Sequence, residues 1–192
     1  MLLEKESWQK EASLMVETQL RARGIQDEPL LSTMASLPRH LFVPESLREE
    51  AYQDGPLPID HQQTISQPYI VAYMTEHLQL NQHATVLEVG TGSGYQTAVL
   101  ARLVKTAYTI DVIESLSKQA KHCLDELNIK NVVYGHRNGY DGWADYAPYD
   151  GIIVTACADS WPETLMAQLK VGARMVLPLG GDHQELYCVH RT

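Results

Sequence analysis

Residues 86–95 read Val86-Leu87-Glu88-Val89-Gly90-Thr91-Gly92-Ser93-Gly94-Tyr95, and this stretch decides the fold that we expect. An apolar segment leads into three alternating glycines, and the residues that follow suit a helix. Glycines at such a turn adopt positive φ angles and let a ligand lie against the backbone. Free amides at a helix start favour a polar or anionic ligand group. Taken alone, the pattern also fits a tight strand–helix turn that binds nothing.

Strands and helices alternate on both sides of this turn. We expect strands at 85–89, 107–111, 131–134, 151–155, 174–179 and 185–190, and helices at 69–78, 95–104, 116–127 and 163–169. Short connections between such elements predict an α/β fold with a mostly parallel, doubly wound sheet that helices cover on both faces.

A helical and loop extension precedes this core. Apolar residues at helical spacing predict a helix over 5–23 that stops at Gly24, and a second helix over 28–36. Residues 42–68 are rich in Pro, Gly, Asp and Gln and predict loops, which at this length are more often functional than idle. We expect one domain, 1–192, made of the extension 1–68 and a ligand-binding core 69–192.

Composition excludes several classes of protein. A formal charge of −9 over 192 residues disfavours binding to nucleic acid, and we expect no nucleic-acid partner. No apolar run approaches the ~20 residues of a membrane span, and residues 1–6 do not resemble a signal peptide, so we expect a cytoplasmic protein without a membrane partner. We also expect a monomer. Cys123, Cys157 and Cys188 are far apart, which predicts neither disulfides nor a metal site.

Two carboxylates indicate which class of ligand the glycine turn binds. Asp111 ends the next strand about twenty residues later, where an acid can accept both hydroxyls of a ribose. Glu88 lies inside the strand, where a buried carboxylate needs a compensating cationic group. The spacing also differs from the G-x-G-x-x-G of dinucleotide sites. These features favour a nucleoside with an amino-acid tail over a nicotinamide dinucleotide.

Several stretches resemble the protein-L-isoaspartate O-methyltransferase family, a branch of the class I S-adenosylmethionine methyltransferases. The glycine turn looks like the first motif of class I, and Asp111 falls on its ribose-binding acid. The branch-specific stretch is Thr64-Ile65-Ser66-Gln67-Pro68. Other matching stretches, in order along the chain, are Arg39-His40-Leu41-Phe42-Val43-Pro44, Leu57-Pro58-Ile59, Tyr95-Gln96-Thr97-Ala98 and Ala147-Pro148-Tyr149-Asp150-Gly151.

The resemblance implies a Rossmann-like methyltransferase fold and a specific reaction. S-adenosyl-L-methionine is then the methyl donor, S-adenosyl-L-homocysteine the product, and the acceptor a carboxylate of L-isoaspartyl residues in damaged proteins and peptides, which the reaction repairs. The donor-binding residues that it implies are Glu88, Gly90, Thr91, Gly92, Ser93, Gly94, Asp111, Asn138 and Gly139. The acceptor-binding residues that it implies are Ile59, His61, Gln63, Thr64 and Ile65, with Ser66 as the catalytic residue.

The chemistry suits a serine beside the acceptor. A carboxylate with a reference pKa near ~3.9 is ionised at neutral pH and needs no general base, so catalysis consists of alignment and removal of water. Two other roles for Ser66 are a hydrolase nucleophile, for which no histidine pattern exists, and a helix cap before Pro68. His61 also suits a solvated loop residue, and Trp143 a core aromatic.

The chain departs from the family at two places near the expected site. The family's Ile-Gly-x-Gly-Gln reads Ile59-Asp60-His61-Gln62-Gln63 here, so two glycines are lost and the family's backbone path is not carried over to this loop. The family's Gly-Asp-Gly reads Arg137-Asn138-Gly139, and Asn138 keeps a carbonyl acceptor without the charge. The alternatives are therefore a class I methyltransferase with another carboxylate or small-molecule acceptor, and a non-catalytic S-adenosylmethionine-binding module.

Overall fold

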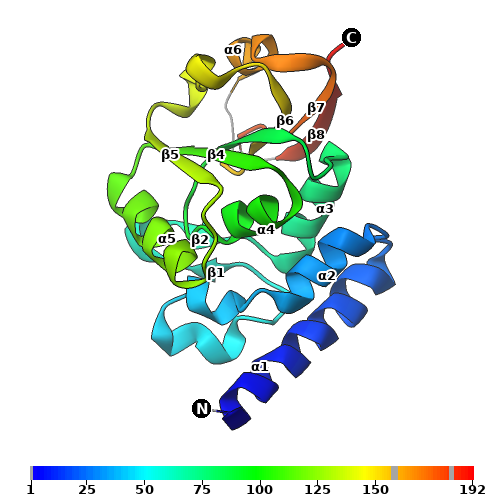
Figure 1. The fold of residues 1–192 in the computed structure, drawn as a ribbon, viewed down its shortest axis with the longest axis vertical. Helices are drawn as coiled ribbons and strands as arrows, with labels where there is room; N and C mark the ends of the chain where they lie inside the picture. Colours follow the sequence, from blue (N-terminus) through cyan, green and yellow to red (C-terminus); the bar gives the residue numbers. More distant parts are fainter. Residues whose placement is uncertain (1, 157–159, 182–183) are drawn as a thin grey trace.

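A six-stranded sheet forms the centre of the computed structural model, which describes residues 2–156, 160–181 and 184–192 (Figure 1). Neighbouring strands are parallel except for the last pair, which is antiparallel. In spatial order the strands are β5 (Val132–His136), β4 (Thr106–Asp111), β3 (Thr85–Val89), β6 (Tyr149–Val154), β7 (Leu169–Leu179) and β8 (Glu185–His190). The predicted α/β class and mostly parallel sheet are confirmed.

Strand β3 lies in the middle of the sheet because its side chains are apolar on both faces. Val86 packs into one core cluster with residues of α4 (Tyr95–Leu103), whereas Leu87 and Val89 pack into a second cluster with Trp143. Alternate residues of a strand point to opposite faces, so a near-continuous apolar run fits a strand that is covered on both sides.

Helices cover both faces of this sheet. Helices α3 (Pro68–Leu78), α4 and α5 (Glu114–Glu126) pack on one face, and the short α6 (Glu163–Ala167) packs with β7 beyond the other (Figure 1). The predicted helix over 163–169 is wrong at its end, because Leu169 already pairs with Tyr149 as the first residue of β7. An apolar run of this length does not distinguish a helix end from a buried strand.

The N-terminal extension forms an outer layer. Helix α1 (Leu2–Met15) continues through η1 (Val16–Leu20) and η2 (Arg21–Arg23) to Gly24, whose φ of 96° confirms the predicted helix stop. Helix α2 (Glu28–Ser36) then packs on α3 and α4.

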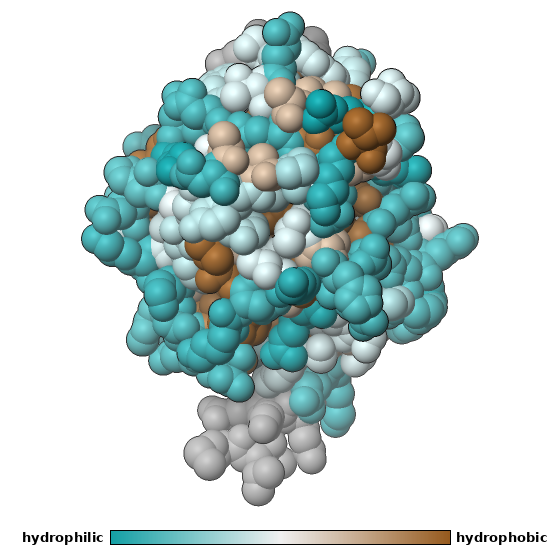
Figure 2. Space-filling model, turned by 45° about the horizontal axis from the view of Figure 1, so that its top comes forward, coloured by the Kyte–Doolittle hydropathy of each residue, from teal (hydrophilic) through white to brown (hydrophobic). Residues whose placement is uncertain are grey.

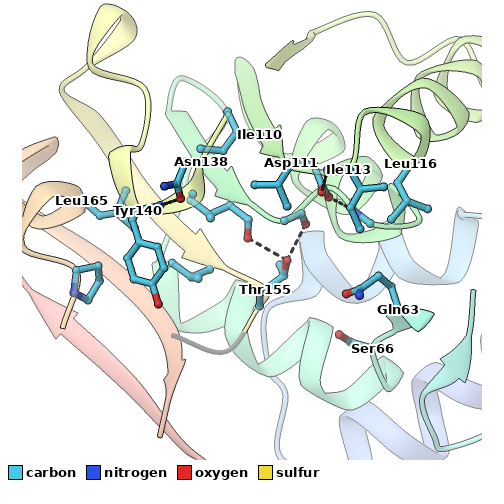
Figure 3. Close-up of a pocket in the computed structure, with 18 of the residues that line it drawn as sticks. Gln63, Ser66, Ile110, Asp111, Ile113, Leu116, Asn138, Tyr140, Thr155 and Leu165 are labelled. Carbon is cyan, nitrogen blue, oxygen red and sulfur yellow. Dashed lines mark hydrogen bonds between the residues drawn. The ribbon is translucent and has the colours of Figure 1, made fainter. Parts of the chain in front are cut away.

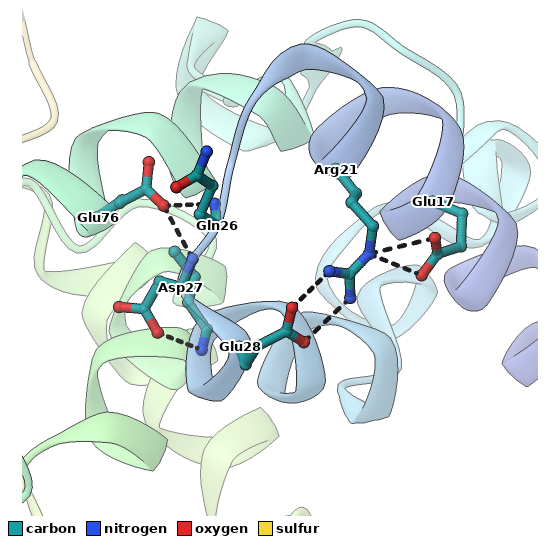
Figure 4. Close-up of polar contacts among 7 residues, drawn as sticks. Glu17, Arg21, Gln26, Asp27, Glu28 and Glu76 are labelled. Carbon is teal, nitrogen blue, oxygen red and sulfur yellow. Dashed lines mark hydrogen bonds and ion pairs between the residues drawn. The ribbon is translucent and has the colours of Figure 1, made fainter.

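Polar contacts fix the turn that joins η2 to α2 (Figure 4). Asp27 caps α2 by accepting a hydrogen bond from the amide of Leu30. The Glu76 carboxylate of α3 accepts from the amides of Gln26, at 2.7 Å, and Asp27, at 2.9 Å. The extension is therefore tied to the core through backbone amides that the helices leave free.

The segment predicted as loops contains short elements. These are η3 (Arg39–Phe42), η4 (Glu45–Glu50), β1 (Leu57–Pro58), η5 (Asp60–Gln62) and β2 (Thr64–Ile65). Strands β1 and β2 form an antiparallel pair with Leu57 opposite Ile65. A two-residue strand has no readable period, which is why the pattern did not indicate the pair.

Apolar side chains lie mostly inside, and the face drawn in Figure 2 is largely hydrophilic with small, separate hydrophobic patches. No helix in the described ranges is long and apolar enough to cross a membrane.

Candidate active site

A cavity of about 350 Å³ opens at the carboxyl ends of β3, β4, β5 and β6. Parallel strands bring their carboxyl ends to one edge of the sheet, which is where ligands bind in open α/β sheets. Figure 3 shows Gln63 and Ser66 on one side of the cavity and Asn138 and Tyr140 on the other. The polar residues of its wall are Gln63, Thr64, Ser66, Asp111, Asn138, Tyr140 and Thr155.

The three glycines of the turn serve different purposes. A Cβ on Gly90 would lie 2.3 Å from the Thr155 hydroxyl oxygen, and one on Gly94 would lie 2.7 Å from Cβ of Ala120 on α5. Gly92 has no atom within 4 Å of its Cβ position and lines the cavity. Gly90 and Gly94 are thus required by packing as well as by positive φ, whereas the space at Gly92 is open to a ligand.

Asp111 is held rigidly at the end of β4. One carboxylate oxygen accepts from the amide of Gly92 at 2.9 Å, and the other accepts from the amide of Ile113 at 2.8 Å. A carboxylate has about four lone-pair sites, so both oxygens can still accept hydroxyl donors from the cavity. The structure brings this acid and the open glycine into the same wall.

Glu88 lies beneath the turn and does not line the cavity. It is fully buried, and one oxygen accepts from the hydroxyls of Thr97, at 2.5 Å, and Thr109, at 2.6 Å. The other oxygen has no partner among the described residues, and burial raises the pKa of Glu88 to about 8. A hydroxyl contact of 2.7 Å from Thr109 to Thr91 links this buried acid to the turn. A direct contact between Glu88 and the expected methyl donor stays a prediction.

Asn138 and Gly139 line the cavity after β5. The Asn138 side-chain oxygen accepts from the amide of Tyr140 at 3.1 Å, and the residue caps η6 (Gly139–Asp141). A Cβ on Gly139 would lie 2.4 Å from a methyl carbon of Val89, so only glycine allows this close approach. Both expected residues are therefore in place, with one lone pair of the Asn138 oxygen already used.

Ser66 lies across the cavity from the strand ends. Its hydroxyl points into the cavity in Figure 3, and Gln63 and Thr64 lie beside it in the wall. A smaller adjoining cavity of about 50 Å³ shares Ser66 and Gly92. Expected residues that line it are Thr64, Ile65, Ser66, Gly90, Thr91, Gly92 and Ser93.

The loop that lacks the family's glycines has a left-handed backbone at two residues. His61 and Gln62 both have φ of 59°, although neither is glycine. Their side-chain neighbours hold the loop on α5: His61 contacts the Ser115 hydroxyl at 2.8 Å, and Asp60 accepts from Gln119 at 3.1 Å. These contacts offset the strain of about 1 kcal/mol per residue. Asp60 therefore points to α5.

Two expected acceptor residues lie away from the cavity. Ile59 packs against the core, and His61 is exposed beside α5. Trp143 is a core residue, 7% exposed, whose indole packs against Tyr108 and Tyr149. The binding roles of Ile59 and His61 stay predictions.

An apolar wall was missed from the sequence. Val89 and Val154 end β3 and β6, and Ile110 is the last residue but one of β4. The other apolar residues follow strand ends, cap α6 or belong to helices α5 and α6. The available signal was a place at or just after the carboxyl end of a predicted strand, and it covers the residues of this wall that do not belong to α5 or α6 or precede α6. The members are Val89, Ile110, Val112, Ile113, Leu116, Val154, Ala156, Pro162 and Leu165.

The residues present fit a nucleoside with an amino-acid tail. The apolar wall suits a planar base, the Asp111 carboxylate suits ribose hydroxyls, and the open space at Gly92 suits a chain lying on the backbone. The described residues include no group of three or more His, Cys, Asp or Glu side chains that would hold a metal ion.

Comparisons with known proteins point to one family of enzymes. The family model described as Protein-L-isoaspartate(D-aspartate) O-methyltransferase matches residues 9–192. A protein-L-isoaspartate O-methyltransferase of Halorhodospira halophila is 55% identical over 174 residues, which are 90% of this chain and 79% of that protein. One from Syntrophus aciditrophicus is 50% identical over 185 residues, 96% of this chain and 85% of that protein.

Solved structures show the same likeness. A protein-L-isoaspartate O-methyltransferase superposes with a TM-score of 0.83 at 27% identity, over 96% of this chain and 60% of that longer chain. A Plasmodium falciparum structure of this description, in complex with S-adenosyl-L-homocysteine, gives a TM-score of 0.81 at 25% identity, over 94% and 90% of the two chains.

Proposed function

Because the chain belongs to the protein-L-isoaspartate(D-aspartate) O-methyltransferase family, we propose that its cavity holds the methyl donor between Asp111 and Ser66. The enzyme is an S-adenosylmethionine-dependent protein-L-isoaspartate O-methyltransferase. The observation that carries the residue assignment is that Ser66, Gly92 and Asp111 line one cavity. Ser66 comes from the N-terminal extension and the other two from the core, so the site joins both parts of the chain.

Donor binding falls to the core. S-adenosyl-L-methionine supplies a methyl group on a sulfonium. Asp111 accepts from the ribose hydroxyls, because its two oxygens are already oriented by the amides of Gly92 and Ile113. Leu116 and Leu165 line the cavity and would provide apolar contacts to the base. Asn138 accepts from an exocyclic amino group through the remaining lone pair of its side-chain oxygen.

Acceptor binding falls to the segment before α3. An isoaspartyl carboxylate is ionised at neutral pH, so the enzyme needs no base to generate the nucleophile. The Ser66 hydroxyl donates one hydrogen bond to this carboxylate and orients its second oxygen toward the methyl group. A neutral donor orients the anion without neutralising it, whereas a cation in direct contact would stabilise the ground state. Catalysis is then alignment of oxygen, carbon and sulfur.

Gln63 and Thr64 keep water away from the reacting atoms. Both line the cavity beside Ser66, and they follow directly after Asp60 and His61, whose side chains hold this segment against α5. A carboxylate that loses its hydration shell is a stronger nucleophile toward a cationic sulfonium, because charge is neutralised in the transition state. This segment, residues 60–64, thus helps both to position the reacting groups and to exclude water from them.

Labelled methyl transfer tests this function. The enzyme is incubated with methyl-labelled S-adenosylmethionine and a peptide that contains isoaspartate, and with the same peptide containing aspartate. We expect base-labile label on the isoaspartyl peptide alone. Equal labelling of both peptides would contradict isoaspartyl specificity, and labelling of neither would leave a donor-binding module without transferase activity. As the physiological role we propose repair of damaged aspartyl and asparaginyl residues in the cytoplasm.

A further inference from the structure

We propose that Arg39 is a positioning residue for methyl transfer, because its buried guanidinium fixes the main chain of Ser66 from behind the site. The proposal rests on the role proposed above for Ser66. Arg39 lies in η3, 27 residues before Ser66, and does not line either cavity. It therefore acts through Ser66 and not on the substrate.

Two carbonyl groups are held by one guanidinium. The Nε atom of Arg39 donates to the carbonyl of Ala51 at 2.7 Å, and one terminal nitrogen donates to the carbonyl of Ser66 at 2.9 Å. The side chain is 0% exposed. The planar fork of arginine fixes the angle between two such bonds, which a flexible ammonium does not. The η4–β1 segment and the catalytic serine are thereby held in one geometry.

Among the residues that the structure describes, no carboxylate pairs with the charge of Arg39. The described part of the chain contains no ion pair to Arg39, and its second terminal nitrogen has no hydrogen-bond partner there. The guanidinium carbon instead lies 4.7 Å from the centre of the Tyr95 ring. An apolar side chain would fill this position without desolvating a cation. The contacts of this buried charge with two carbonyls and a ring therefore indicate that Arg39 serves to position these groups.

Each of these contacts reaches the site. Ser66 stands between β2, which ends at Ile65, and α3, which begins at Pro68, so neither element's hydrogen bonds hold its carbonyl. Tyr95 follows the glycine turn directly and lines the smaller cavity with Ser66. Arg39 thus contacts Ser66 and a second residue of the same smaller cavity. A displacement of the serine by about 1 Å is enough to lower the rate about 100-fold.

The first test compares kcat, KM for an isoaspartyl peptide, and S-adenosylhomocysteine affinity in Arg39→Met and Arg39→Lys. The matched control is Leu37→Ala, a fully buried neighbour that does not contact the site. We expect Arg39→Met to lower kcat about 30-fold or more, with cofactor affinity within about twofold of wild type. Leu37→Ala, assayed below its Tm, should lower kcat less than about threefold.

Arg39→Lys keeps the buried charge and provides the comparison if Arg39→Met does not fold. One ammonium does not reproduce the fork, so we expect an intermediate loss of about tenfold in kcat. A wild-type kcat for Arg39→Lys contradicts the proposal. So does a loss in Arg39→Met no larger than that of Leu37→Ala, because it would reduce Arg39 to a residue of general stability.

A double-mutant cycle with Ser66→Ala separates this proposal from the function on which it rests. If Arg39 acts through the serine hydroxyl, the Arg39→Met loss should shrink to about threefold or less once that hydroxyl is gone. An undiminished loss in the Ser66→Ala background overturns the role of Arg39 alone. A wild-type rate in Ser66→Ala itself refutes the role of Ser66 and this inference together.

Discussion

Asp111→Asn is the substitution that most directly tests how the donor is held. It preserves the shape of the side chain and removes its charge. The carboxylate accepts from two backbone amides at 2.9 and 2.8 Å, so the new amide group must turn its nitrogen toward either Gly92 or Ile113. One backbone donor then loses its acceptor, and one ribose hydroxyl loses a charge-assisted bond.

The expected loss of donor affinity follows from these contacts. A hydrogen bond to a charged group contributes about 1.5–3 kcal/mol. Losing one such bond, with 1.4 kcal/mol for each factor of ten, raises the Kd of S-adenosylhomocysteine about 10- to 100-fold. The unpaired backbone amide costs about 1 kcal/mol of folding stability as well.

Isothermal titration calorimetry with S-adenosylhomocysteine measures this loss. The matched control is Asp125→Asn, an exposed carboxylate on α5 that pairs with Lys121 and Lys130 and lies outside the cavity wall. The control should bind with wild-type affinity. If Asp111→Asn binds within about twofold of wild type, the ribose does not rest on Asp111 and the proposed donor orientation is wrong.

Three further perturbations probe the acceptor, the buried acid and the turn. Ser66→Ala should lower kcat at least about tenfold with cofactor affinity unchanged; a calorimetric loss of affinity instead would place Ser66 on the donor. Burial raises the pKa of Glu88 to about 8. Between the ordinary pKa of a glutamate and pH 8, the native state therefore holds a proton that the unfolded state has released. Glu88 thus destabilises the fold increasingly as pH rises toward 8. Glu88→Gln should therefore gain free energy of unfolding relative to wild type by up to about 1.4 kcal/mol per pH unit between pH 5.5 and 7.5 in urea titrations, and a constant difference would contradict the raised pKa. Gly92→Ala and Gly172→Ala should each lower the free energy of unfolding by about 1 kcal/mol, because both glycines have positive φ and open space around them. Only Gly92→Ala should weaken S-adenosylhomocysteine binding, and equal affinity in the two variants would remove Gly92 from the donor site.

The core was predictable because its chemistry is local. Residues 86–95 combine a strand, a glycine turn and a helix start, and Asp111 follows at the next strand end. The alternation of strands and helices with short connections then predicts a mostly parallel sheet with helices on both faces. The structure agrees at each of these points, and places Asp111 and Gly92 in one wall.

The parts that sequence reasoning missed depend on contacts between distant residues. Gln62 keeps φ of 59° without being glycine, because side chains of α5 hold the neighbouring residues of its loop. Glu88 lies under the turn, where its carboxylate accepts from the hydroxyls of Thr97 and Thr109, which come from two other elements. Arg39 and Ser66 meet across 27 residues. No local pattern indicates such a pairing, since neither spacing nor propensity encodes it.

A crystal structure of the enzyme with S-adenosylhomocysteine tests the central claim most directly. We expect ligand density across Gly92, with the ribose hydroxyls within hydrogen-bond distance of the Asp111 carboxylate and the sulfur facing the Ser66 hydroxyl. Density that places the sulfur away from Ser66, or the ribose away from Asp111, would contradict it.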